Sequence, residues 1–149
     1  MSSFHIRPVT PADAATWLRL RTAHWPDGAA DHGPEIAAFF AGTARDPQAV
    51  FLAEYAETPT KSGRHSERSA ESLFVVALME LSIRIDLAPL PNVKVGYVEG
   101  FYIVPEFRGR GLARQLLRFA QDWARQQHCP GFASDRSGRI IFDPHYRSP

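Results

Sequence analysis

A basic, glycine-rich stretch near residue 110 has the residue types of an anion site. It runs Arg108-Gly109-Arg110-Gly111-Leu112-Ala113, between an apolar segment that ends at Pro105 and an expected helix that continues to about Gln127. A helix N-terminus presents free backbone N–H groups and a partial positive charge. Glycines let the backbone approach a ligand closely, and arginines add charge and forked donors. The stretch therefore predicts a cradle for a pyrophosphate group. Taken alone, a strand-to-helix turn with solvated arginines remains the simpler interpretation.

The same stretch matches a family motif. It is neither the Gly-x-Gly-x-x-Gly dinucleotide fingerprint nor the phosphate loop that ends in Lys-Ser/Thr. It does fit Arg/Gln-x-x-Gly-x-Gly/Ala, and the apolar strand ending in Pro105 precedes it at the right distance. The chain thus resembles the Gcn5-related N-acetyltransferases (GNAT), which bind acetyl-CoA through this motif. The resemblance implies an α/β (α+β) fold in which a mixed, mostly antiparallel sheet is flanked by helices.

The resemblance also implies which residues hold acetyl-CoA, the expected cosubstrate. In the family a bulge in the fourth strand splays that strand from the fifth, and free backbone groups bind the pantetheine arm. Here those groups belong to Phe101 and Ile103. The pyrophosphate is expected on the backbone of the loop, and one further arginine either reaches a phosphate or stays solvated. The loop residues concerned are Arg108, Gly109, Arg110, Gly111, Leu112, Ala113 and Arg114.

Within the family, four short motifs resemble the chromosomal type of aminoglycoside 6'-N-acetyltransferase. They are Leu20-Arg21 followed by His24-Trp25-Pro26, then Ser82-Ile83-Arg84-Ile85-Asp86, Val98-Glu99-Gly100 and Ala133-Ser134-Asp135. The resemblance implies that Trp25 lies against the sugar, that Glu99 is the base or a water-linked base, and that Asp135 faces the amines of the substrate. The implied reaction is acetyl transfer from acetyl-CoA to the 6'-amino group of an aminoglycoside, which is an antibiotic-resistance activity.

The charge of such a substrate fits these residues. A polycationic amine needs carboxylates near the reacting nitrogen, and Glu99 and Asp135 are expected to lie close together at the ends of adjacent strands. Neighbouring carboxylates raise each other's pKa, so Glu99 and Asp135 are the expected catalytic pair, one of which accepts a proton. Asp31 and Glu35 add negative charge at the rim. Each key residue also has a simpler interpretation. These are an ordinary salt bridge for Glu99, a helix or turn cap for Asp135, and core packing for Trp25.

Two other functions stay open. The first is a GNAT enzyme that acts on another amine, such as a polyamine or a protein N-terminus. The second is an acyl-CoA-binding module without catalysis. The second is suggested by the end of the chain, because relatives continue with a further loop, helix and strands, whereas 14 residues follow Asp135 here.

The atypical tail, residues 136–149, has two expected consequences. An uncovered apolar face favours association, so a homodimer is expected, with strand exchange between subunits as one route. The segment Ile140-Ile141-Phe142 is expected to pair as a strand. Tyr102 and Tyr146 are the candidates to protonate the departing thiolate.

The composition of the chain limits the number of domains and the kinds of partner that can be expected. The chain has 149 residues, which suits a single domain over 1–149. Seventeen Lys and Arg against 16 Asp and Glu give a net charge of +1, so neither nucleic acid nor a membrane is an expected partner. The N-terminus lacks a signal peptide and the single cysteine, Cys129, is interpreted as structural, so the protein is expected to be cytoplasmic. The six histidines show no metal-ligand spacing, and no metal is expected.

Hydrophobic periodicity and turn residues predict the elements that position these groups. Helices are expected to begin at Pro11, Pro34 and Leu112. A rigid linker is expected over 87–92, and the polar segment 57–72 is expected to be a long mobile insertion. Strands are expected at 4–9, 49–55, 74–85, 95–104 and 131–134.

Overall fold

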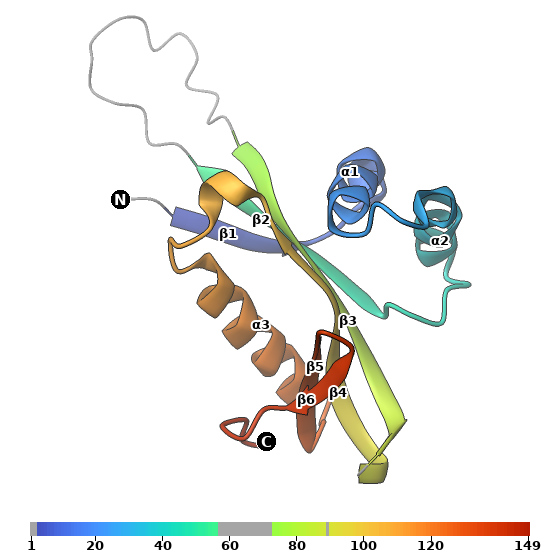
Figure 1. Ribbon diagram of the computed structural model, residues 1–149, viewed down its shortest axis with the longest axis vertical. Helices are drawn as coiled ribbons and strands as arrows, with labels where there is room; N and C mark the ends of the chain where they lie inside the picture. Colours follow the sequence, from blue (N-terminus) through green and yellow to red (C-terminus); the bar gives the residue numbers. More distant parts are fainter. Residues whose placement is uncertain (1–2, 57–72, 89) are drawn as a thin grey trace, which may run out of the picture.

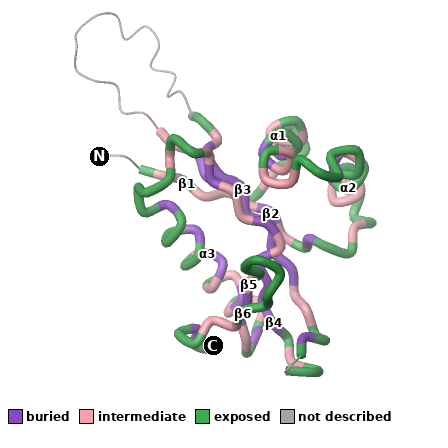
Figure 2. The backbone as a smooth tube through the Cα atoms, viewed as in Figure 1, coloured by how far each residue is buried: buried purple, intermediate pink, exposed green. Residues whose placement is uncertain are grey.

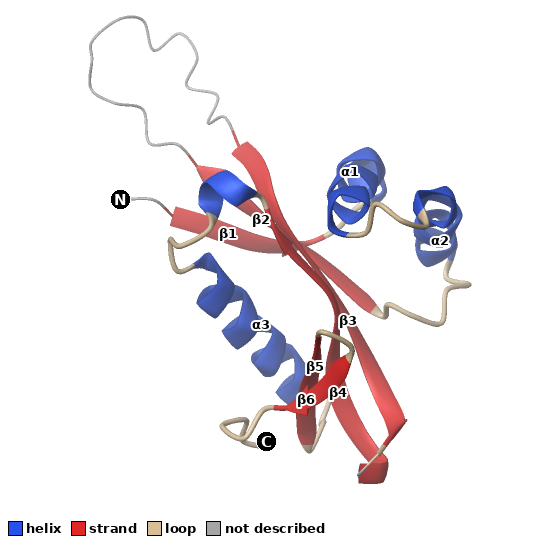
Figure 3. Ribbon diagram, in the orientation of Figure 1, coloured by secondary structure: helices blue, strands red, loops and turns tan. Residues whose placement is uncertain are grey.

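A single mixed sheet forms the centre of the computed structural model, which describes residues 3–56, 73–88 and 90–149. The insertion predicted over 57–72 lies outside these residues. Six strands of the described chain pair in sequence order, and all pairs are antiparallel except β4 and β5, which are parallel (Figures 1 and 3). The strands are β1 (Ser3–Pro8), β2 (Ala49–Ala56), β3 (Leu73–Leu87), β4 (Leu90–Ile103), β5 (Gly131–Arg136) and β6 (Arg139–Phe142). The predicted fold class is confirmed.

Helices cover both faces of the sheet. A short 3-10 helix (Pro11–Asp13) leads into α1 (Ala14–His24), which packs with α2 (Ala29–Ala41) on one face. On the other face lies α3 (Leu112–Gln126), which follows a second 3-10 helix (Pro105–Phe107) (Figure 1). The residues of α3 at i, i+4, i+8 and i+12 from Leu112 are all buried, so this stripe turns toward the sheet (Figure 2).

The two faces carry separate hydrophobic cores, and β3 contributes to both. Met79 and Leu81 pack with Leu116 and the rest of the α3 stripe. Leu78 packs with Trp17 of α1 and with its neighbours on α2 and β2. Alternate side chains of a strand point to opposite faces, so a strand covered on both faces has little room for charge.

Two predicted boundaries are wrong. Helix α2 begins at Ala29, not at Pro34, because Gly28 in the left-handed region (φ 82°) starts the helix and the proline is accommodated inside it. Residues 87–92 are not a linker, since Leu87 pairs with Leu90 and the two strands meet in a tight hairpin.

A bulge interrupts β4 at Glu99. Gly100 pairs with Glu80 of β3, whereas Val98 pairs with Leu81, which leaves Glu99 as one extra residue on β4. The parallel pairing of β4 with β5 runs from Val95 only to Val98, although β4 continues to Ile103. The last part of β4 therefore has β3 on one side and a free edge on the other, as the splay predicted from the sequence requires.

The end of the chain packs on the α3 face. Residues 140–142 do form a strand, and β6 pairs with β5 of the same chain. Beyond it, Tyr146 stacks on Phe132 with ring centroids 5.6 Å apart, and its hydroxyl donates to the carbonyl of Cys129 at 2.7 Å. These contacts cover apolar surface that the short tail was expected to leave open.

Candidate active site

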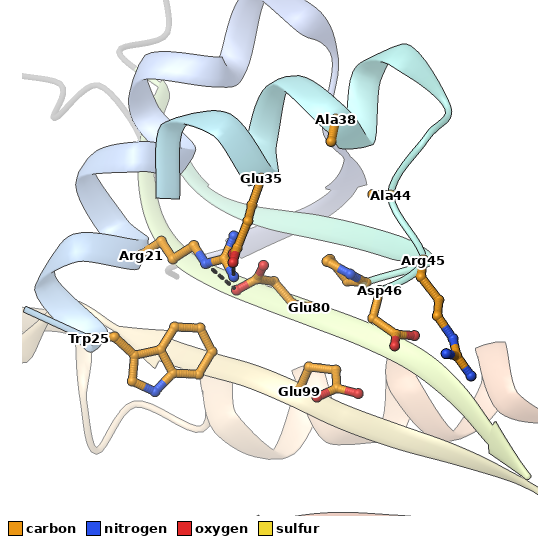
Figure 4. Close-up of a pocket in the computed structure, with 10 residues that line it drawn as sticks. Arg21, Trp25, Glu35, Ala38, Ala44, Arg45, Asp46, Glu80 and Glu99 are labelled. Carbon is orange, nitrogen blue, oxygen red and sulfur yellow. Dashed lines mark ion pairs between the residues drawn. The ribbon is translucent and has the colours of Figure 1, made fainter. Parts of the chain in front are cut away.

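Three cavities adjoin the free part of β4. The first, which we call the acidic pocket, has a volume of about 480 Å³ and lies on the face covered by α1 and α2 (Figure 4). Four carboxylates and two guanidinium groups line it together with one indole ring. Its lining consists of Arg21, Trp25, Glu35, Ala38, Ala44, Arg45, Asp46, Pro47, Glu80 and Glu99.

The bulge explains why Glu99 reaches this pocket. A Cβ built on Gly100 would lie 2.8 Å from the Trp25 ring, so Gly100 faces α1, and Glu99 lines the pocket on that same face. In a regular strand, two neighbours would point to opposite faces. The extra residue in β4 therefore places Glu99 beside the indole that the sequence predicts as a substrate contact.

Glu99 is held by an arginine from the neighbouring strand. Arg84 donates from Nε to Oε1 at 2.8 Å and from its terminal nitrogen to Oε2 at 2.7 Å. The same guanidinium lies 4.3 Å from the ring centroid of Tyr97. The hydrogen bonds that Arg84 donates to Glu99 raise the pKa of Arg84. The salt-bridge interpretation of Glu99 is therefore observed, and it coexists with a position in the pocket wall.

Trp25 forms one side of the pocket, immediately after α1. Its ring is half-buried, lies tilted against the His24 ring with centroids 4.4 Å apart, and lies 5.6 Å from the guanidinium carbon of Arg21. Arg21 also forms an ion pair with Glu35 of α2. Glu35 thus lines the pocket as expected, whereas Asp31 does not.

Glu80 is the most buried of the pocket's charged residues, and the sequence motifs missed it. It follows Leu78 on the α1 face of β3 and is 1% exposed. Burial raises its pKa to about 7, and the charge of Arg21 offsets part of this effect. The signal was present in the sequence, because a single glutamate within the apolar run Phe74–Ile83 marks a buried charge.

The second cavity, the loop cavity, has a volume of about 710 Å³ and lies where β4 meets the glycine-rich loop. Gly109 and Gly111 adopt positive φ angles of 77° and 83°, which favour glycine, and a Cβ at either would meet nothing within 4 Å. The backbone at the start of α3 is therefore open to a ligand. The cavity is lined by His24, Phe101, Tyr102, Ile103, Arg108, Gly109, Gly111, Ala113 and Arg114.

The free edge of β4 presents the two residues predicted to bind pantetheine. Val104 N–H donates to Val76 of β3 at 2.9 Å. Because backbone groups alternate between the edges of a strand, Phe101 and Ile103 direct theirs away from β3. The carbonyl of Ile103 accepts a hydrogen bond from Arg108 Nε at 2.8 Å. The edge thus offers hydrogen-bonding groups, one of which is paired with the first arginine of the loop.

The third cavity, the strand cavity, has a volume of about 340 Å³ and shares Phe101, Ala113 and Arg114 with the loop cavity. It lies between the splayed ends of β4 and β5, under α3. Asp135 is found here, with Val98, Leu117, Ser134 and Arg136.

Glu99 and Asp135 do not line the same cavity, and two of the predicted loop residues can offer only their backbone to a ligand. Asp135 and Glu99 were expected to share one site, but they line two different cavities, and Oδ1 of Asp135 accepts from Gly138 N–H at 3.0 Å as a turn cap. The side chain of Leu112 is buried in the core, and Arg110 lies over the ring of Phe107. Their side chains do not line the loop cavity, so only their backbone is available to it.

Comparisons with known proteins agree with this geometry. Residues 14–137 match the Acetyltransferase (GNAT) family. An aminoglycoside N(6')-acetyltransferase type 1 of Klebsiella aerogenes is 36% identical over 135 residues, covering 90% of this chain and 79% of that protein. One of Acinetobacter haemolyticus is 32% identical over 146 residues, covering 97% and 88%. This chain belongs to the GNAT acetyltransferase family.

A solved structure supports the assignment in three dimensions. The aminoglycoside N-acetyltransferase AAC(6')-Iy in complex with CoA matches this acetyltransferase with a TM-score of 0.70 at 26% identity, covering 92% of this chain and 79% of that one. The family resemblance predicted from the loop and the four motifs is thereby confirmed.

The two candidate tyrosines differ in this acetyltransferase. Tyr102 lines the loop cavity, whereas Tyr146 is buried against Cys129 and lines none of the three cavities. Within the described residues, no helix is long and apolar enough to cross a membrane, and no three His, Cys, Asp or Glu side chains gather as metal ligands.

Proposed function

We propose that the protein transfers the acetyl group of acetyl-CoA to the 6'-amino group of aminoglycosides. The observation that carries the proposal is the acidic pocket, in which four carboxylates and the Trp25 ring line a cavity of about 480 Å³ at the bulge of β4. Carboxylates attract a polycationic sugar, and an aromatic face suits its ring. Relatives at 30% identity or more that bear the name aminoglycoside N(6')-acetyltransferase type 1 support the choice of substrate.

Acetyl-CoA is proposed to enter through the loop cavity. Its pyrophosphate lies on the backbone amides of residues 108–113, where open glycines and the helix start favour an anion. Its pantetheine arm runs along the free edge of β4 and pairs with Phe101 and Ile103, which requires Arg108 to release the Ile103 carbonyl. Arg114 is proposed as a further phosphate contact.

The substrate contacts are proposed on both sides of β4. Trp25 and Glu99 act from the acidic pocket and Asp135 from the strand cavity. Holding the amine and the thioester side by side converts a bimolecular reaction into one within a complex.

Thiol release from acetyl-CoA tests the proposal. Kanamycin or tobramycin is the acceptor, and an analogue with a 6'-hydroxyl group is the matched negative control. The buried Cys129 thiol contributes little background under native conditions because its pKa is raised by burial. Turnover that requires the 6'-amine supports the proposal. If the protein binds acetyl-CoA but acetylates neither kanamycin nor tobramycin, the proposal is refuted.

We further propose that the protein forms a homodimer. Ile140 and Ile141 of β6 are each 42% exposed, and β6 ends the described sheet order, so apolar surface is available beside a strand edge. Because β6 pairs with β5 of its own chain, strand exchange is not needed to complete this pairing. Sedimentation equilibrium of the wild type and of Ile141→Lys tests the proposal. A monomeric wild type refutes it.

A further inference from the structure

Both oxygens of Glu80 lack a hydrogen-bond partner among the described residues, although the side chain is 1% exposed. A buried carboxylate without donors is costly, and native proteins keep such groups where a function requires them. Glu80 lines the acidic pocket beside Trp25 and Glu99 (Figure 4). The missing donor is therefore to be sought in a ligand of this pocket.

The surrounding elements supply charge to Glu80 but no hydrogen bond. From α1, Nε of Arg21 lies 3.7 Å from Oε2, beyond hydrogen-bond distance, and the Trp17 indole N–H, which has no hydrogen-bond partner, lowers the pKa of the carboxylate. From α2, Glu35 forms an ion pair with Arg21 and so competes with Glu80 for this guanidinium. His32, also on α2, lowers the pKa of Glu80 to a smaller extent. From β4, the neighbouring residue on this face is Gly100, which has no side chain.

Gly100 lets Glu80 and Trp25 approach each other closely, because only glycine fits between them without a shift. A Cβ at this position would lie 2.7 Å from Oε2 of Glu80 and 2.8 Å from Cη2 of Trp25. Any residue larger than glycine would thus enter the gap between the carboxylate and the indole. Oε2 of Glu80 and the edge of the Trp25 ring thus lie close together over Gly100, so an ammonium group that binds at this ring edge approaches the carboxylate.

Glu99 is poorly arranged to accept a proton. Each of its oxygens already accepts a hydrogen bond from Arg84, at 2.8 Å and 2.7 Å. A proton placed on either oxygen would displace one of these charge-assisted hydrogen bonds. The two glutamates of the pocket therefore suit different tasks, a fixed negative charge for Glu99 and proton exchange for Glu80.

We propose that Glu80 is the group that accepts the proton of the amine, and that Glu99 attracts and orients the cationic substrate. The inference deepens the proposed function and rests on it. The pKa of Glu80, raised to about 7 by burial, adds support, because a general base works best when its pKa lies near the working pH.

The proton balance of the reaction is simple. The substrate ammonium gives one proton to the Glu80 carboxylate and becomes a neutral amine. The nitrogen lone pair forms the C–N bond at the thioester carbonyl, and the C–S bond breaks with its electron pair on sulfur. The second proton leaves the nitrogen and ends on the thiolate. Glu80 then releases its proton to solvent, so the net products are the acetamide, CoA thiol and one proton.

The pH dependence of kcat/KM for wild type, Glu80→Gln and Glu99→Gln tests the inference between pH 5.5 and 8. For the wild type, kcat/KM is expected to rise about tenfold per pH unit below pH 7 and to level off above pH 7; the rising part is the acidic limb of the profile. Glu80→Gln is expected to lose this limb and to lower kcat by about 10²–10⁴-fold. Glu99→Gln is expected to raise KM while keeping the limb. Glu80→Asp, which retains a carboxylate, is expected to keep the limb with a lower kcat.

Each outcome is decisive. A Glu80→Gln protein that folds and keeps both the limb and a kcat within threefold of wild type overturns the assignment of Glu80. Loss of the limb in Glu99→Gln instead would make Glu99 the base. Absence of thiol release by the wild type at every pH overturns the proposed function, and this inference with it. If Glu80→Gln does not fold, the limb and kcat of Glu80→Asp decide, since an unchanged kcat would exclude Glu80 from the proton transfer.

Discussion

Replacing Glu80 by glutamine should stabilise the protein as the pH rises. The pKa of Glu80 is raised from 4.5 to about 7, so the folded state favours the protonated carboxyl. Between these two values the folded protein binds more protons than the unfolded chain, and wild-type stability falls with increasing pH. Glutamine resembles the protonated form at every pH, and the variant lacks this loss.

The magnitude follows from the size of the shift. At about 1.36 kcal/mol per pKa unit, an ionised Glu80 costs about 3 kcal/mol of folding free energy above pH 8. Integrated between pH 5.5 and pH 8.5, the change assigned to Glu80 is about 2 kcal/mol. Any constant effect of the new amide cancels, because only the pH dependence of the difference between the two proteins is used.

Urea denaturation at pH 5.5 and 8.5 measures this difference. The advantage of Glu80→Gln over wild type should grow by about 2 kcal/mol from the lower to the higher pH. The exposed Glu106→Gln is the matched control and should follow wild type at both values. If the free energies of unfolding of wild type and Glu80→Gln differ by the same amount at both pH values, within about 0.5 kcal/mol, Glu80 titrates like an exposed carboxylate and the reasoning fails.

Three further predictions follow from close contacts and one hydrogen bond. Gly96→Ala places a Cβ 2.6 Å from the Cβ of Ala124 and should destabilise the fold by about 1–3 kcal/mol in urea, whereas Gly131→Ala, an ordinary contact, should cost less. An equal loss in both variants would contradict this. Gly100→Ala forces Glu80 or Trp25 to shift and should lower thiol release at least tenfold while leaving acetyl-CoA affinity, measured by calorimetry, unchanged; weakened affinity would show that the acidic pocket and the loop cavity are not independent. Tyr146→Phe removes a buried donor and should cost about 1 kcal/mol in thermal unfolding, and an unchanged melting temperature would show that the bond contributes nothing.

The fold could be predicted from the sequence mainly where local chemistry and periodicity agree. The loop at 108–113 and the apolar stripe of α3 both point to a helix start at Leu112, and the helix begins there. Pro34 misled the prediction for α2, because a proline is common at the first turn, whereas here Gly28 starts the helix and the proline lies inside it. The hairpin at Leu87 and Leu90 was hidden by its prolines, which are typical of linkers as well as of turns.

The candidate site was predicted as a set of motifs but not as an arrangement. Trp25 and Glu99 line one pocket, as the resemblance implies, while Asp135 lies in another. Strand adjacency alone does not tell which face a side chain takes once a bulge intervenes. Glu80 belongs to no motif, and its character comes from burial by α1 and from Arg21, which lies 59 residues earlier in the chain. Such long-range contacts are set by the tertiary fold.

The bulge at Glu99 separates two parts of β4 that have different neighbours. Before it, the strand closes the sheet against β5; after it, the same strand offers a free edge. Deleting Glu99 would make Val98 and Gly100 regular neighbours opposite Leu81 and Glu80, so Phe101 and Ile103 would still face away from β3, but the local bend that goes with the bulge would be lost. A single inserted residue thus divides one continuous strand into a structural half and a ligand-facing half. Shortening the strand by that residue would remove the Glu99 carboxylate from the acidic pocket and the bend at which the pairing of β4 with β5 ends.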